Sequence, residues 1–240
     1  NGVSWHALGA GLEDTFNTVW PSTPRRGAYA LGVYNSQLVA AGRFTGSAGT
    51  TATNIAAWNG SSWNPLGPGL GVVPSAFADE GVYSVTPFAG DRFATGVFPN
   101  SGSAAVQSVA RWNGAAWTPT QGVLYSTSTP VYALLPWAGG MLVGGDYSYL
   151  YLQNSLAYNF AKWTGLSVKA GDFSPDGAIR VMGAFNRSPP ISADVYVAGD
   201  FTNIYPPGAA GIPASRIVTT NSLFGMGWQA MGAGFNATVR

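Results

Sequence analysis

The stretch AAWNGSSWNPLGPGL (56–70) places two tryptophans, Trp58 and Trp63, on either side of an Asn-Gly pair. Asn and Gly both accept the positive φ of a tight hairpin turn, so the pattern predicts two short strands joined at Asn59-Gly60. The arrangement recurs as ARWNGAAWTP (110–119), as the weaker AKWTGLSV (161–168), and as the half-copy NGVSWHALGAGL (1–12).

The spacing of these copies is regular. Trp112 follows Trp58 by 54 residues (112 − 58), and Trp163 follows Trp112 by 51 (163 − 112). A period near 50 is typical of repeat proteins such as propellers. A second unit precedes each copy and ends in an aromatic residue: YALGVYNSQLVAAGRF (29–44), VYSVTPFAGDRFATGVF (82–98), VYALLPWAGGMLVGGDY (131–147) and IRVMGAFNRSPPISADVYVAGDF (179–201).

Each repeat divides into four short strands, because apolar runs alternate with Gly, Asn and Asp at turn positions. In the second repeat we expect strands over 82–88, 92–98, 108–112 and 115–118, with a three-residue Ala89–Asp91 turn between the first two. A glycine inside the second strand of every repeat predicts a bulge or the close approach of another backbone: Gly42, Gly96, Gly145 and Gly199.

These features resemble the kelch-type repeats and the related repeats of bacterial and fungal surface propellers. The resemblance lies in the Gly-x-aromatic end of the second strand, the Trp-Asn-Gly-x-x-Trp hairpin and the Gly-rich exit. Kelch repeats carry a double glycine after the second strand, and the only clear counterpart here, Gly144-Gly145, lies within that strand. It implies an all-β fold, a β-propeller of four-stranded antiparallel blades. We expect one domain over residues 1–240 with four full blades, at about 28–66, 82–120, 131–170 and 178–232.

Two further strands are expected at the ends, over 3–8 and 237–240. The first resembles the fourth strand of a blade whose other three strands this chain lacks. We therefore expect the residues to belong to a longer chain and a larger propeller, or their open edges to pair with another chain, since exposed strand edges promote aggregation.

Composition excludes several classes of function. There is no cysteine, which excludes disulfides, cysteine-ligated metals and thiol catalysis. Charged residues make up 9% of the chain with a net charge of +1, against about 25% in an average protein, so no basic field favours nucleic acid. No stretch approaches the length of an apolar membrane helix. The small, uncharged residues that remain are typical of extracellular and cell-surface proteins.

The longer loops of an up-and-down blade all lie on one face, which is the expected binding surface because rigid scaffolds carry function on loops. We expect the paired tryptophans to fill the space between blades instead. The ligand-binding candidates on the long-loop face are Trp20, Arg25, Arg26, Asp79, Glu80, Tyr149, Tyr151 and Tyr205.

Catalytic signals are sparse. His6 is the only histidine and lies in the predicted first strand, where an ordinary strand residue is expected. Glu13-Asp14 and Asp79-Glu80 fall in equivalent loops and supply the carboxylates that a glycoside hydrolase needs. No metal or cofactor site is expected. Three Asn-x-Ser/Thr triplets permit glycosylation, at Asn59, Asn186 and Asn236.

The sequence thus predicts a non-enzymatic extracellular propeller that binds glycans or proteins, or assembles into a larger surface structure. The alternative is a secreted carbohydrate-active enzyme that uses the loop carboxylates.

Overall fold

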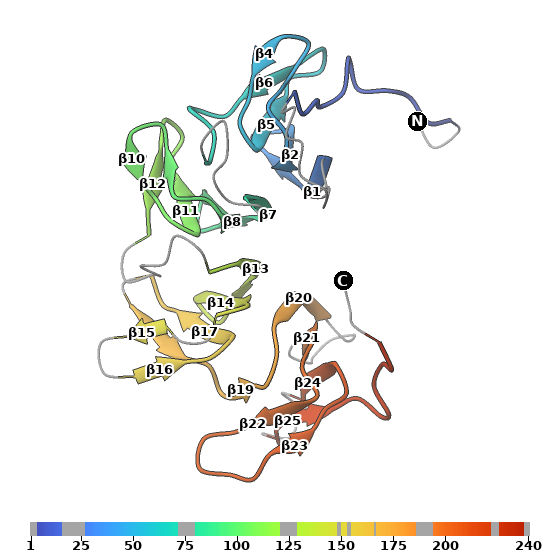
Figure 1. Ribbon diagram of the computed structural model, residues 1–240, viewed down its shortest axis with the longest axis vertical. Helices are drawn as coiled ribbons and strands as arrows, with labels where there is room; N and C mark the ends of the chain where they lie inside the picture. Colours follow the sequence, from blue (N-terminus) through green and yellow to red (C-terminus); the bar gives the residue numbers. More distant parts are fainter. Residues whose placement is uncertain are drawn as a thin grey trace. The chain divides into compact units, whose positions relative to one another are not determined.

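The computed structural model describes residues 4–15, 27–71, 80–120, 129–147, 150–152, 155–165, 167–185, 194–221 and 226–237. Over these residues the protein is built from antiparallel sheets and contains no helix (Figure 1). None of the described segments is therefore a long apolar helix able to cross a membrane. The chain divides into two compact units, the first made mainly of residues 1–120 and the second mainly of residues 129–240.

The first unit contains two four-stranded sheets, each formed by one repeat of the sequence. In both, the strands lie in the order first, second, third, fourth, so that the first strand forms one edge. Sheet 1 consists of β1 (Gly27–Tyr34), β2 (Gln37–Arg43), β5 (Ile55–Trp58) and β6 (Trp63–Pro65), and sheet 2 of β7 (Gly81–Phe88), β8 (Asp91–Val97), β11 (Val109–Trp112) and β12 (Trp117–Pro119).

The second unit repeats this arrangement twice. Sheet 3 consists of β13 (Val131–Trp137), β14 (Gly140–Gly145), β17 (Phe160–Trp163) and β18 (Val168–Ala170), and sheet 4 of β20 (Ile179–Phe185), β21 (Asp194–Gly199), β24 (Ile217–Asn221) and β25 (Met226–Ala230).

Every repeat has a small accessory sheet formed by the chain between its second and third strands, joined in the fourth repeat by β19, which precedes the first strand. Three are hairpins, and the last has three strands. They consist of β3 (Gly46–Ser47) with β4 (Thr50–Thr51), β9 (Asn100–Ser101) with β10 (Ala104–Ala105), β15 (Leu150–Leu152) with β16 (Ser155–Ala157), and β19 (Ser174–Pro175) with β22 (Asn203–Tyr205) and β23 (Ile212–Pro213).

The glycine in each second strand is required by a bulge in the strand beside it. All four first strands, β1, β7, β13 and β20, carry a register shift near their beginning. The bulge brings a carbonyl oxygen so close that a Cβ on Gly96 would lie 2.0 Å from the oxygen of Gly81, and Gly42 and Gly199 are equally restricted. No side chain fits there, which confirms the prediction of close backbone approach.

The tryptophan pairs face each other across the third and fourth strands. Trp58 pairs with Trp63 and Trp112 with Trp117, with ring centroids 5.5 and 5.3 Å apart. Trp112 and Trp117 belong to the apolar cluster that fills the space between sheets 1 and 2. The expected filling of the space between sheets is confirmed for Trp112 and Trp117, whereas Trp58 and Trp63 belong to a separate cluster of sheet 1.

The turns differ from the prediction. Four residues, not two, separate Trp58 from Trp63, and Asn59 Oδ1 accepts hydrogen bonds from the amides of Ser61 and Ser62. The two-residue turns instead join the first and second strands. Their central residues all have positive φ: Asn35 and Ser36 (46° and 60°), Ala89 and Gly90 (51° and 83°), and Ala138 and Gly139 (48° and 77°).

The sheets reproduce the four predicted repeats closely, and the all-β class and the repeated four-stranded antiparallel sheets are confirmed. A closed propeller is not found in either unit. The extra strand expected over 3–8 is wrong for the described residues 4–8, which belong to no strand because no strand lies beside them to supply hydrogen bonds. Of the strand expected over 237–240, only Ala237 is described, and it lies in a bend.

Candidate interaction surface

Neighbouring sheets within a unit pack through their first strands. In the first unit β1 contacts β7, where Gly32 lies so close to Val85 that an added Cβ would be 3.2 Å from Val85 Cγ1. The residues at the two bulges, Tyr29 and Tyr83, stack with ring centroids 5.5 Å apart. Each first strand therefore has two faces: a leading face toward the preceding sheet and a trailing face toward the following one.

In the second unit the first strands also pack against each other, but an arginine over a tyrosine replaces the two stacked tyrosines. β13 packs against β20, and the guanidinium of Arg180, at the bulge of β20, lies 4.3 Å from the ring centroid of Tyr132. Arg180 also donates two hydrogen bonds to Asp200 Oδ2, at 2.8 and 2.6 Å. Partial burial works to lower the pKa of Arg180, but the bonds to Asp200 prevail and raise it above its ordinary value. The arginine is thus fixed in its charged form over the tyrosine.

The leading face of β1 is apolar and uncovered. Leu31 is 64% exposed and Val33 is similarly exposed. The residue equivalent to Leu31 in the next repeat is Val85, which is only 8% exposed because Gly32 of β1 lies against it. Leu31 is thus exposed at a position that is buried in the next sheet of the same unit, which indicates a face that lacks its neighbour, whereas the position of Val33 is also exposed in sheet 2, at Pro87.

The trailing face of β20 is uncovered in the same way. Phe185 is 61% exposed and Val181 about half exposed. The equivalent residues on β1, Tyr34 and Ala30, pack against the cluster between sheets 1 and 2. The other strands of sheet 4 agree: on this face Tyr196 and Ile217 are only partly buried, whereas Val39 and Ile55, their equivalents in sheet 1, are fully buried.

A third apolar feature is a segment that follows the fourth strand of a sheet, which we call the exit segment. It has the pattern Trp-x-x-(Leu/Met)-Gly-x-Gly-(Leu/Phe), and its two glycines have positive φ in every copy. The three copies are the N-terminal exit segment Trp5–Leu12, the middle exit segment Trp63–Leu70 and the C-terminal exit segment Trp228–Phe235.

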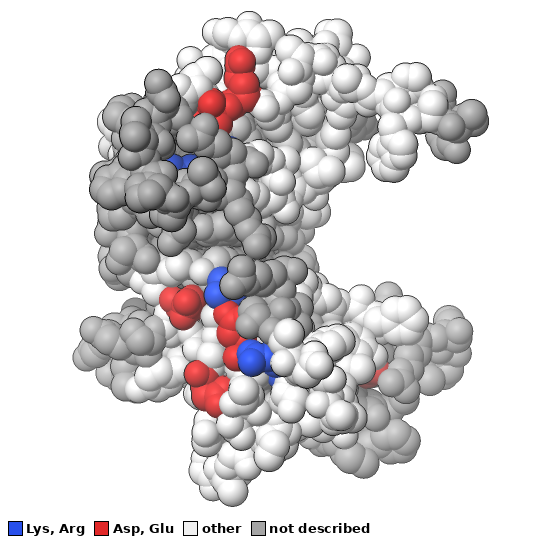
Figure 2. Space-filling view, turned by 45° about the vertical axis from the view of Figure 1, so that its right-hand side comes forward, with Lys and Arg blue, Asp and Glu red and all other residues white. Residues whose placement is uncertain are grey.

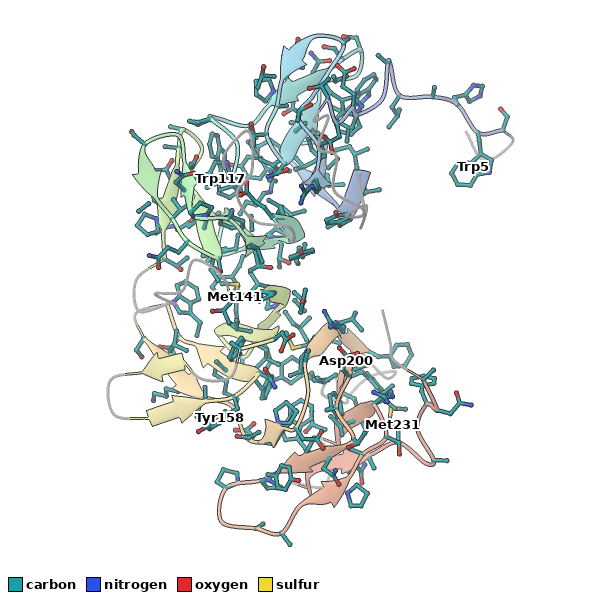
Figure 3. The ribbon with its side chains drawn as sticks, in the orientation of Figure 1. Trp5, Trp117, Met141, Tyr158, Asp200 and Met231 are labelled. Carbon is teal, nitrogen blue, oxygen red and sulfur yellow. The ribbon has the colours of Figure 1, made fainter. Side chains whose placement is uncertain are left out.

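Only the middle exit segment lies between two sheets. Its Leu70 is buried in the cluster between sheets 1 and 2, and Trp117 of sheet 2 donates to the Leu66 carbonyl at 2.9 Å. In the N-terminal copy Trp5 is fully exposed and projects from an extended stretch (Figure 3). In the C-terminal copy Met231 and Phe235 are exposed. Each terminal copy therefore lacks one of the two sheets that enclose the middle one.

Of the residues predicted to be displayed on the long-loop face, one is exposed, one is buried, and the side chains of the others are not described. Tyr205 is exposed in β22, as expected of a surface residue. Glu80 is buried, so its expected display on the surface is wrong: it directly precedes β7 and its carboxylate lies beside Gly71. Tyr151 lies in β15, but its side chain is outside the described part of the structure. Trp20, Arg25, Arg26, Asp79 and Tyr149 lie outside the described residues.

The acidic residues proposed for catalysis have separate surroundings. The carboxylate of Glu13 is exposed and accepts a hydrogen bond from the Gly49 amide at 3.2 Å, whereas Glu80 is buried. No group of three or more His, Cys, Asp or Glu residues able to hold a metal occurs in the described ranges. On the face drawn in Figure 2, charged side chains are few and most of the described surface is uncharged.

Two of the three glycosylation triplets can be placed. Asn59 and Asn236 are exposed, and Asn186 lies outside the described residues. His6, also exposed, hydrogen-bonds Ser4 and is not in a strand.

The sequence matches no protein-family model, and no curated protein is significantly similar to it. The uncovered faces of β1 and β20 were not among the residues predicted from sequence. A signal for them does exist, because the C-terminal exit segment GWQAMGAGF (227–235) closely resembles SWHALGAGL (4–12). Both ends of the repeat series therefore carry a copy of the exit segment.

Proposed function

We propose that this protein is a non-enzymatic, extracellular repeat protein of the β-propeller type, related in design to kelch-like surface propellers, which acts by assembly or by binding other proteins. The observation that carries the proposal is the pair of uncovered apolar faces on the outermost sheets, with Leu31 on β1 and Val181 and Phe185 on β20. Faces at the same repeat positions form the contacts between sheets inside each unit.

The low charge of the chain supports the same proposal. With 9% charged residues and a net charge of +1, copies of the protein repel one another weakly. Apolar patches on such a surface contribute to association in proportion to the area they bury. An extracellular location fits the many small, uncharged residues of the chain and the exposed side chains of Asn59 and Asn236.

The proposal is tested by measuring the molar mass of the purified protein by light scattering over a wide concentration range. We expect the mass to rise above that of one chain, 24.9 kDa, as concentration increases. A glycan array and an oligosaccharide-cleavage assay on the same sample test the other possibilities. A strictly monomeric protein that cleaves oligosaccharides would overturn the proposal in favour of an enzyme.

A further inference from the structure

The N-terminal exit segment occupies on sheet 1 the same place that the middle exit segment occupies on sheet 2. Trp63 Nε1 donates to the Leu8 carbonyl at 3.2 Å, as Trp117 Nε1 donates to that of Leu66. A Cβ on Gly9 would meet the ring of Trp58, as one on Gly67 would meet the ring of Trp112. The two segments therefore fill equivalent sites.

The accessory hairpins complete the equivalence. The Glu13 amide donates to the Gly46 carbonyl at 2.9 Å, and the Gly71 amide donates to that of Asn100 at 2.8 Å. Thr45 adds a hydrogen bond from its amide to the Glu13 carbonyl, at 2.8 Å. We call Leu8–Glu13 the plug, because it fills a site that elsewhere holds the exit segment of a preceding complete sheet.

The C-terminal exit segment makes the contact with its own sheet that the middle exit segment makes with sheet 1. The Phe235 amide donates to the Ser215 carbonyl at 2.8 Å, as the Leu70 amide donates to that of Thr53. It is thus attached to its own sheet as the middle copy is, while the side that would meet a following sheet, with Met231 and Phe235, is exposed.

From these contacts we propose that the plug of one copy of the chain is displaced by Met231–Phe235 of a second copy. In this arrangement the trailing face of β20 in the second copy packs on the leading face of β1 in the first. This inference rests on the proposed assembly function. The two faces differ and lie at opposite ends of the repeat series, so the contact is head-to-tail and repeats along an assembly.

The plug and the C-terminal exit segment of a second copy cannot occupy the site on sheet 1 together, and the structure indicates that the plug is the segment that is displaced. The described residues before the plug, 4–7, belong to no strand. The C-terminal exit segment instead continues from β25, which pairs with β24 at four positions. Detaching the plug from sheet 1 breaks a few hydrogen bonds and the packing of Leu12. Detaching the C-terminal exit segment from its own sheet would also remove the outer strand β25 from sheet 4.

The plug can be locked with a disulfide. In sheet 2 a Cβ on Gly102 would lie 3.2 Å from Pro68 Cβ, and the equivalent positions around the plug are Ala48 and Ala10. This is close to the separation of about 3.5–4.5 Å that a disulfide needs, and the chain has no other cysteine. We expect the oxidised variant A10C/A48C to self-associate about tenfold or more weakly than its reduced form. Wild-type protein exposed to the same oxidant is the control.

A crosslink identifies the incoming segment. Ala233 is the equivalent of Pro68 in the C-terminal exit segment, so mixing the single variants A233C and A48C should give a disulfide-linked dimer of the two. Mixing A233C with Ala115→Cys, an exposed position in the loop after β11, should give far less. Removal of residues 1–13 should strengthen self-association by about tenfold, because no plug has to leave.

The possible failures are distinguishable. If every form of the protein stays monomeric and binds no other protein, the proposed function is wrong. If the protein associates but the locked and reduced forms associate equally, or A233C and A48C do not crosslink, the displaceable plug is wrong while assembly stands. If the double variant A48C/A233C forms its disulfide only within single chains, the occupant is the protein's own C-terminal segment and not a second copy.

Discussion

Replacement of Arg92 by methionine should stabilise the protein. Arg92 lies in β8, is 1% exposed, and its Nη1 and Nη2 have no hydrogen-bond partner among the described residues. Its guanidinium carbon lies 3.7 Å from the centroid of the Tyr34 ring. The equivalent residues of the other sheets are apolar: Leu38, Met141 and Val195. The position is therefore a core position that in sheet 2 holds a charge.

The pKa of Arg92 gives the magnitude. Burial lowers it from its ordinary value to about 10, although Tyr34 works in the opposite direction. A fall of this size means that the folded state disfavours the charged guanidinium by about 3 kcal/mol. Methionine removes this cost but also loses the contact with Tyr34, which contributes about 1 kcal/mol. We expect Arg92→Met to raise the free energy of unfolding by about 2 kcal/mol.

The assay is urea unfolding followed by tryptophan fluorescence, in which the midpoint should rise with an unchanged slope. The matched control is Arg111→Met, since Arg111 is half exposed and pairs with Asp91 at 2.6 Å. Such surface pairs contribute about 1 kcal/mol or less. The gain from Arg92→Met should also shrink as pH rises above 10, because folded Arg92 then loses its proton before the unfolded chain does. A midpoint below that of the wild type at neutral pH would refute the reasoning.

Three further predictions use other parts of the structure. Burial raises the pKa of Tyr147 well above 10, so the unfolded state ionises first and the stability of the wild type should fall above pH 10. Tyr147→Phe should lower the free energy of unfolding by about 1 kcal/mol at neutral pH, because it removes one hydrogen bond, and should not show the fall above pH 10. Urea midpoints at neutral pH and above pH 10 measure both effects. Gly96→Ala should destabilise by about 3 kcal/mol in the same assay because its Cβ would overlap a carbonyl oxygen, whereas Gly183→Ala, with nothing within 4 Å, should have little effect. Leu31→Asp should weaken self-association, measured by light scattering, by about tenfold without lowering thermal stability. The control is Gln37→Asp, since Gln37 is exposed on the neighbouring strand β2, and it should change neither quantity. Equal effects of the two substitutions would exclude the leading face of β1 as a contact.

Local features of the sequence were sufficient to predict the repeats. The strand-bound glycines, such as Gly96, predict close backbone approach because any side chain there would be excluded. The turns were harder to predict. Ala89 and Ala138 occupy left-handed positions that favour Gly or Asn, and they adopt this conformation because the paired strands on either side fix the turn length.

The candidate surface depends on tertiary neighbours in a way that local sequence does not record. Trp5 and Trp63 begin nearly the same motif, yet Trp63 is buried in a strand and Trp5 is exposed outside one. A strand requires a partner strand for its hydrogen bonds, and burial requires other residues to pack against the side chain, as Leu12 packs against the cluster that contains Trp63.

By itself, therefore, the sequence of this protein determines four repeated antiparallel sheets, because turn residues, strand glycines and apolar runs act over short distances. Only the tertiary structure decides that Leu31 on β1 and Phe185 on β20 are exposed while Val85 is covered. All three are apolar residues in first strands, and their exposure depends on whether another sheet packs against them.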